Sequence, residues 1–168
     1  MAELEADIAT LIREYQAKTG KLLTIGAVES ATGGRIADRI TNIPGSSDYF
    51  KGSVVAYSNE VKTVLLGVQK ATIDSYGAVS EQTALEMAQG GRKLLDVDIC
   101  VSDTGIAGPS GDTLEKPVGL FYLALAATDA NLRRKHNFPG NREENKRYAA
   151  EAALNMMKQY LLRRFDAT

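Results

Sequence analysis

The chain has 168 residues, is 44% hydrophobic, carries a formal net charge of −1, and contains one histidine and one cysteine. A chain of this length can bury a core without disulfides or metals, so we expect one domain over residues 1–168. The balanced charge argues against nucleic acid as a partner, and no apolar run approaches the roughly 18 residues of a membrane span. The acidic N-terminal segment is unlike a secretory signal, which favours a cytoplasmic protein with no membrane partner.

Hydrophobic periodicity predicts helices that alternate with buried strands. Helices are expected at about 3–19, 33–43, 60–67, 81–95 and 142–164, and strands at about 22–30, 53–59, 98–104, 118–127 and 132–139. Gly20 could end the first helix, and Thr32 and Ser80 could cap two others.

This alternation predicts an α/β domain with helices on both faces of the sheet. The last two expected strands adjoin each other and leave no room for a helical crossover. They should therefore pair antiparallel and make the roughly five-stranded sheet mixed. The short basic run 133–135 fits a solvated edge of that sheet.

Loops that follow strand ends are the places where ligands gather in open α/β sheets. The loop 29–34 runs directly into a helix, whose N-terminal N–H groups suit an anion. Gly33 and Gly34 would allow close approach of the backbone, and the Ser30 and Thr32 hydroxyls add donors. The alternative is a plain threonine cap followed by a glycine turn.

A second glycine-rich loop, 105–117, is about 13 residues long, which exceeds the usual loop length. Its prolines and apolar residues argue against disorder. Such a loop could hold an anion or an oxyanion with its backbone N–H groups. The alternative is a rigid surface excursion.

The usual catalytic bases are scarce. His136 fits an exposed strand position and Cys100 a buried, inert thiol. No His or Cys grouping has zinc spacing, so neither a metal nor a cofactor is expected. A lysine whose amine is neutralised by burial could instead activate a hydroxyl group, and Tyr57 and Lys62 could point into one cavity. The alternative makes Lys62 a solvated helix residue and Tyr57 part of the core.

Six stretches together resemble the family of the C-terminal domain of CinA, whose stand-alone members are similar to the nicotinamide mononucleotide amidohydrolase PncC. The resemblance covers about residues 5 to 162. The stretches are "AVESATGGRIADRIT", "IPGSSDYFKGSVVAYSNEVKTVLLGV", "YGAVSEQTALEMAQG", "TGIAGPSG", "EKPVGLFYLALA" and "FPGNRE".

The resemblance implies hydrolysis of the carboxamide of nicotinamide mononucleotide, giving nicotinate mononucleotide and ammonia. It assigns a serine nucleophile, a tyrosine and a lysine, which match Ser47, Tyr57 and Lys62. It further implies a three-layer α/β/α fold and a homodimer. The positions that match the family's substrate-binding regions are Ser30, Thr32, Gly33, Gly34, Thr104, Gly105, Gly108 and Arg142.

The sequence also departs from the family pattern and leaves alternatives open. Residues 144–146 stand where the family usually has an apolar residue followed by a second arginine, which puts a second anion contact in doubt. The N-terminal domain of full-length CinA proteins is not expected. Ser46 is a rival nucleophile, and a non-catalytic nucleotide sensor is the competing function.

Overall fold

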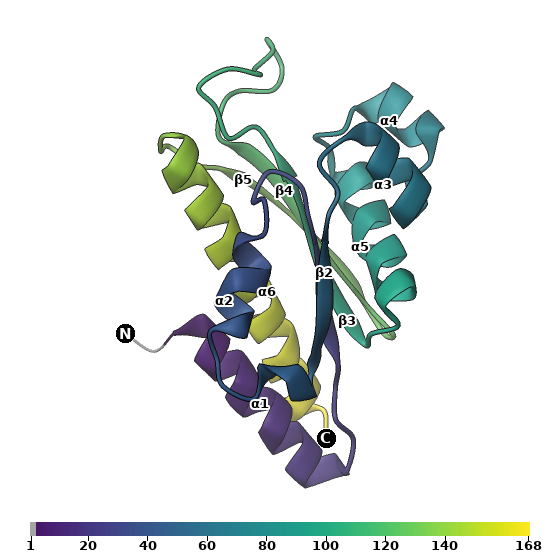
Figure 1. Ribbon diagram of the computed structural model, residues 1–168, viewed down its shortest axis with the longest axis vertical. Helices are drawn as coiled ribbons and strands as arrows, with labels where there is room; N and C mark the ends of the chain where they lie inside the picture. Colours follow the sequence, from purple (N-terminus) through teal and green to yellow (C-terminus); the bar gives the residue numbers. More distant parts are fainter. Residues whose placement is uncertain (1–2) are drawn as a thin grey trace.

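Five strands form one mixed sheet in the order β2-β1-β3-β4-β5 in the computed structural model, which describes residues 3–168 (Figure 1). The strands are β1 (Ile25–Glu29), β2 (Phe50–Val55), β3 (Ile99–Gly105), β4 (Leu120–Ala127) and β5 (Asn131–Asn137). β1 pairs in parallel with β2 and β3, whereas β4 pairs antiparallel with β3 and β5. The predicted mixed sheet with an antiparallel final pair is confirmed.

Helices cover both faces of this sheet and give a three-layer α/β/α fold (Figure 1). One face carries α1 (Leu4–Thr19), α2 (Arg35–Thr41) and α6 (Arg142–Asp166). The other carries α3 (Asn59–Leu66), α4 (Lys70–Tyr76) and α5 (Glu81–Leu95). The parallel strands β1 and β3 point in one direction, so their carboxyl ends lie at the same end of the sheet.

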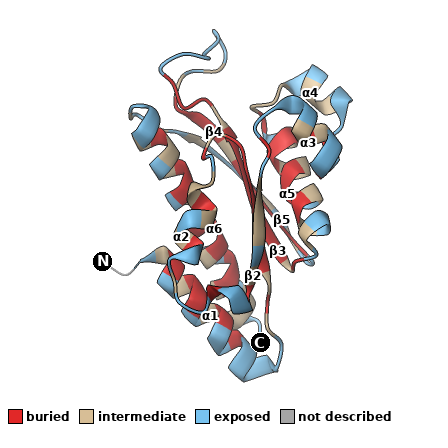
Figure 2. Cartoon of the chain, viewed as in Figure 1, coloured by how far each residue is buried: buried red, intermediate tan, exposed pale blue. Residues whose placement is uncertain are grey.

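The core lies on both sides of the central strands, because β1 and β3 are buried on both faces (Figure 2). All five residues of β1 are buried, as the nearly continuous apolar run predicts. The larger apolar cluster joins the sheet to α1 and α6 and includes Ile12, Ile25 and Leu125. β5 forms the edge, and its basic residues 133–135 are exposed as expected.

Several helix ends follow the predicted chemistry. Gly20 ends α1 in a left-handed conformation with φ 78°, and the Ser80 side chain accepts a hydrogen bond from the Thr83 N–H at the start of α5. Two elements were not predicted, namely α4 and the 3-10 turn η1 (Ser46–Asp48). α4 buries none of its residues, so it has no apolar periodicity for a sequence pattern to reveal.

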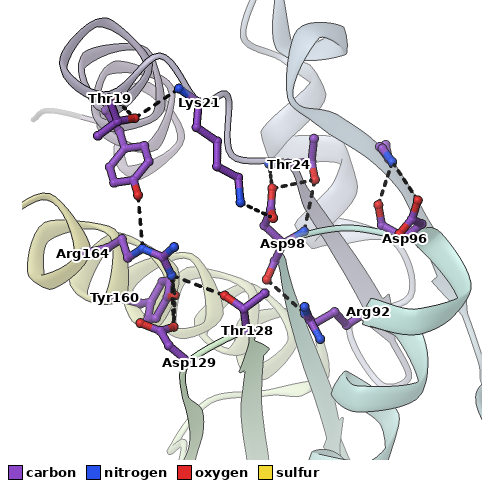
Figure 3. Close-up of polar contacts among 12 residues, drawn as sticks. Thr19, Lys21, Thr24, Arg92, Asp96, Asp98, Thr128, Asp129, Tyr160 and Arg164 are labelled. Carbon is purple, nitrogen blue, oxygen red and sulfur yellow. Dashed lines mark hydrogen bonds and ion pairs between the residues drawn. The ribbon is translucent and has the colours of Figure 1, made fainter. Parts of the chain in front are cut away.

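Polar contacts hold the end of the sheet where β1 and β3 begin (Figure 3). The Asp98 carboxylate accepts from the Thr24 N–H at 2.9 Å and pairs with Lys21 at 3.2 Å. On α6, Arg164 donates to the Tyr160 hydroxyl at 2.9 Å. The pocket described below lies at the opposite end, where β1 and β3 finish. No helix within residues 3–168 is both long and apolar enough to cross a bilayer.

Candidate active site

A pocket of about 300 Å³ lies at the carboxyl ends of β1 and β3. Its walls come from the segments after β1, β2 and β3, from the segment before α5, and from the first residue of α6. The predicted site residues that line it are Ser30, Tyr57, Lys62, Thr104, Gly105 and Arg142. The position agrees with the rule that ligands bind outside the carboxyl ends of parallel strands.

Lys62 is buried at the base of this pocket, with only 2% of its surface exposed. It belongs to the first turn of α3, which Ser58 begins by accepting from the Val61 N–H. Its Nζ lies 2.9 Å from Ser30 Oγ, 2.8 Å from the Ala56 carbonyl oxygen and 3.0 Å from the Tyr57 carbonyl oxygen. Burial lowers the pKa of Lys62, and the nearby Asp103 carboxylate partly opposes that change.

Ser30 is the hydroxyl that the fold places beside this amine. It follows the last residue of β1 and is buried, and its backbone N–H donates to Asp103 Oδ1 at 3.0 Å. Its side chain also lines the pocket. The sequence interpretation gave Ser30 a role in substrate binding. The structure makes it the serine within reach of Lys62.

Ser47 does not belong to this group, so the prediction that it lies beside Tyr57 and Lys62 is wrong. Ser47 and its rival Ser46 lie in η1, before the first residue of β2, whereas Lys62 follows the last residue of that strand. Six strand residues separate the two ends, which corresponds to roughly 20 Å. The segment before η1 instead contacts α1, where Arg13 donates to the Pro44 carbonyl oxygen.

Tyr57 lies at the pocket mouth with 64% of its surface exposed. Its hydroxyl is 3.4 Å from Arg142 Nη2, and Arg142 Nη1 donates to the Gly108 carbonyl oxygen at 2.7 Å. Only the backbone carbonyl of Tyr57 accepts from Lys62. The expected meeting of Tyr57 and Lys62 in one cavity is confirmed, but the arrangement gives the tyrosine hydroxyl no contact with the lysine amine.

Thr32 is fully buried and does not cap α2 or line the pocket, in contrast to both sequence interpretations. Its hydroxyl contacts two carboxylates, Glu29 and Asp103. The Glu29 carboxylate, projecting from the end of β1, takes over the cap by accepting from the backbone N–H groups of Gly34, Ile36 and Ala37. Sequence reasoning missed this role, although an acidic residue that closes an apolar run was the available signal.

Gly33 and Gly34 form the turn before α2 with φ values of 64° and 106°, which favour glycine. Neither lines the pocket described above, and Gly33 is exposed beside it. A Cβ on Gly33 would lie 3.5 Å from Lys146 Nζ. Helix α6, which begins at Arg142, thus brings the Lys146 ammonium group to this turn. Lys146 belongs to the stretch 144–146, where the departure from the family pattern puts a second anion contact in doubt.

The glycine that ends β3 and a glycine in the loop after it are needed for close packing. A Cβ on Gly105 would lie 2.4 Å from the Phe121 ring, and one on Gly108 would lie 2.5 Å from Val118. Thr104 is buried at the end of β3 and donates to the Ala78 carbonyl oxygen at 2.8 Å. Lys116 fastens the loop by donating to the carbonyl oxygens of Tyr76 and Val79 at 2.7 Å. The loop is therefore an ordered wall of the pocket.

Another hollow, of about 340 Å³, lies between β5 and α6 and includes His136 in its lining. The His136 ring stacks on Phe138, and burial lowers the pKa of the imidazole. Cys100 is buried as predicted, and burial raises the pKa of its thiol to about 12. Neither residue lies in the pocket that contains Lys62, so the catalytic interpretation centres on Ser30 and Lys62.

The family model of the CinA C-terminal domain matches residues 5–161 of the chain. This chain belongs to that family. Sequence relatives agree with this assignment. A putative competence-damage inducible protein of Halothermothrix orenii is 54% identical in an alignment that covers 84% of this chain and 36% of the relative. A CinA-like protein of Syntrophomonas wolfei is 47% identical over 92% of this chain and 36% of its own length. The chain thus spans about a third of these relatives.

Solved structures of this family share the fold. The competence/damage inducible protein CihA from Agrobacterium tumefaciens is 36% identical with a TM-score of 0.84, covering 92% of this chain and 93% of that one. A CinA superfamily protein from Enterobacter cloacae is 26% identical with a TM-score of 0.87, covering 95% of this chain and 91% of that one. The α/β/α architecture is therefore that of the CinA superfamily.

Proposed function

We propose that this CinA-family domain is an amide hydrolase that deamidates nicotinamide mononucleotide through Ser30 and Lys62. The observation that carries the proposal is the 2.9 Å contact between the buried Lys62 Nζ and Ser30 Oγ inside a pocket. A buried lysine with a lowered pKa can exist as an amine, and an amine beside a hydroxyl group can act as its base.

The proposed reaction starts with attack of Ser30 Oγ on the carboxamide carbon while Lys62 Nζ takes the serine proton. Protonated Lys62 then delivers that proton to the departing nitrogen as the C–N bond breaks, which releases ammonia and leaves an ester on Ser30. Water attacks the ester, Lys62 accepts one of its protons, and the proton returns to Ser30 Oγ when nicotinate mononucleotide leaves. The Tyr57 hydroxyl, whose partner is Arg142, is proposed to contact the substrate instead of transferring this proton.

Two cations, one in the pocket lining and one at the neighbouring glycine turn, support an anionic substrate such as a nucleoside monophosphate. Arg142 lines the pocket, and Lys146 reaches the glycine turn at Gly33. Lys146 and the glycine turn are proposed to hold the phosphate, and Arg142 with Tyr57 to contact the ribose or the ring. A volume of about 300 Å³ is at the lower end of ligand pockets and favours a mononucleotide over a dinucleotide.

An ammonia-release assay with nicotinamide mononucleotide tests the function, with Ser30→Ala and Ser47→Ala as a matched pair. The wild type and Ser47→Ala are expected to release ammonia at similar rates, because Ser47 lies at the other end of β2. Ser30→Ala is expected to lose at least about 100-fold in kcat. Full activity of Ser30→Ala would contradict the mechanism. Nucleotide binding by the wild type without ammonia release would favour a sensor.

A further inference from the structure

Two carboxyl groups, those of Glu29 and Asp103, share one threonine hydroxyl behind the pocket. Both side chains are completely buried at the ends of neighbouring parallel strands, β1 and β3. Thr32 Oγ1 lies 2.7 Å from Glu29 Oε1 and 2.5 Å from Asp103 Oδ1. The two carboxyl groups are therefore held on either side of a single oxygen atom.

A hydroxyl group has one hydrogen to donate, and an ionised carboxylate can only accept. If both carboxyl groups were ionised, the Thr32 hydroxyl could donate to only one of them. In its other contact, two oxygen atoms that can only accept would face each other without a hydrogen between them. Two buried negative charges this close also repel each other. A proton on one of the two carboxyl groups resolves both problems, because that group then donates to Thr32 Oγ1 while Thr32 donates to the other.

The donors around each group indicate which carboxyl carries the proton. Glu29 accepts from three backbone N–H groups at the start of α2 and from the Ser53 hydroxyl at 3.1 Å, all of which favour its ionised form. Asp103 accepts from only two backbone N–H groups, those of Ser30 and Thr32. Burial, together with the Glu29 charge, raises the pKa of Asp103 to about 6 despite these bonds.

The surroundings of Lys62 agree with a neutral Asp103. Within residues 3–168, Lys62 forms no ion pair, and its Nζ contacts only two carbonyl oxygens and the Ser30 hydroxyl. Lys62 Nζ donates to all three of these oxygens, and none of them carries a full charge. Arg142 of the pocket lining and Lys146 at the Gly33 turn form no ion pair with Asp103 in the same part of the chain. On the α5 side, the Ser102 hydroxyl of β3 donates to the neutral backbone carbonyl of Ala84.

We propose that Asp103 is a positioning residue that carries a proton at mildly acidic pH, donates to Thr32 Oγ1 while Thr32 donates to Glu29, and so presents no full negative charge to Lys62 beside Ser30. This proposal rests on the proposed function for its catalytic meaning. Asp103 performs two tasks at once. Its carboxyl oxygens fix the backbone of the loop that carries Ser30, and when it is protonated its charge no longer raises the pKa of Lys62.

Infrared spectroscopy of the ligand-free protein tests the proton directly and needs no turnover. At about pH 5.5, well above the ordinary aspartate pKa of about 4, the wild type is expected to show the carbonyl stretch of a protonated carboxylic acid. Asp103→Asn is expected to lose that band. The control Asp98→Asn, at the other end of β3, should keep it, because Asp98 pairs with Lys21. Absence of the band from the wild type, or its persistence in Asp103→Asn, would overturn the proposal.

Thr32→Val provides a second test that does not depend on Asp103→Asn folding. It removes the hydroxyl that accepts from Asp103 while keeping the shape of the side chain, so the carboxylic acid band should remain and move to higher frequency. If neither the wild type nor Thr32→Val showed a carboxylic acid band, a proton on Asp103 would be ruled out.

The pH profile of kcat/KM supplies a catalytic readout. Asparagine resembles a protonated carboxyl, so below about pH 6 the acid limb of Asp103→Asn should stay within about half a pH unit of wild type. A displacement of one unit or more toward acid would identify Asp103 as an ionised partner of Lys62 instead.

Discussion

At the residue scale, the lowered pKa of Lys62 follows from burial of its amine among oxygen atoms that carry no full charge. We expect Lys62→Met to keep the apolar length of the side chain and to remove the base. The predicted result is a loss of about 100- to 10,000-fold in kcat, with little change in the Kd for nicotinamide mononucleotide. Steady-state kinetics and calorimetry measure the two quantities. Lys70→Met, an exposed change on α4, is the control, and undiminished kcat in Lys62→Met would rule out the base.

A second residue-scale prediction concerns Lys146, whose ammonium group reaches the Gly33 turn. Lys146→Met should raise the KM for nicotinamide mononucleotide about tenfold with kcat unchanged, because a charge-assisted hydrogen bond contributes about 1.5 kcal/mol. Lys146→Arg should retain most of the affinity. Lys158→Met is the control. Lys158 lies farther along the same helix and forms an ion pair with Asp7 of α1. An unchanged KM in Lys146→Met would remove this lysine from substrate binding.

The residues of the site show what sequence reasoning can reach. The spacing of Tyr57 and Lys62 allows both to face one cavity but leaves a solvated lysine and a core tyrosine as the alternative, and the structure places both in the pocket lining. The proposed nucleophile, Ser30, differs from Ser47, which the family resemblance assigns, because β2 separates Ser47 from Lys62 in space. Ser30 is distant in sequence, and only the parallel pairing of β1 with β2 brings it to the amine.

At the element scale, the position of α3, and with it Lys62, depends on how closely α5 packs. A Cβ on Gly90 would lie 1.7 Å from the Leu66 carbonyl oxygen at the end of α3. Alanine normally stabilises a helix interior by about 1 kcal/mol over glycine, but overpacking against backbone costs about 1–3 kcal/mol or more. We therefore expect Gly90→Ala to lower the free energy of unfolding and to reduce kcat by displacing α3.

Chemical denaturation and the ammonia assay check this prediction side by side. Gln89→Ala, on the exposed face of the same helix, should leave both quantities nearly unchanged. A Gly90→Ala protein as stable and as active as wild type would show that α3 is not held by this contact. The close approach itself has no sequence signal, because glycines within a helical pattern do not reveal which element they meet.

The elements with strong periodicity were predictable, and those shaped by tertiary contacts were not. α1, α5 and α6 begin and end within a few residues of the predicted bounds, since each has an apolar stripe and Gly20 or Ser80 marks an end. α2 starts later than predicted because its cap is Glu29, a residue of β1. The strand after it, β2, ends at Val55, before the expected Asn59, because Ser58 begins α3.

At the scale of the whole molecule, the buried carboxyl of Asp103 should affect the pH dependence of stability. Its pKa is raised from 3.8 to about 6 in the folded protein, so the folded state holds a proton that the unfolded chain releases. Stability should therefore fall as pH rises from about 4 to about 6, by up to roughly 3 kcal/mol from this group alone.

The difference in free energy of unfolding between wild type and Asp103→Asn isolates this effect, because the remaining carboxyl groups are common to both proteins. Urea denaturation at several pH values should show the wild type losing stability relative to the variant across that window. If the difference in free energy of unfolding between the two proteins did not change with pH, the pKa of Asp103 would be the same in the folded and the unfolded state. The homodimer expected from the family resemblance stays a prediction that sedimentation equilibrium can test.

The longest helix has a practical consequence. α6 begins at Arg142 beside the pocket and runs for 25 residues, which is roughly 37 Å, to the far end of the sheet (Figure 1). A fluorescent dye or a biotin attached after its last turn would therefore sit remote from bound nucleotide. Surface immobilisation through that end should leave ligand entry unobstructed, so association and dissociation could be followed in real time on the intact domain.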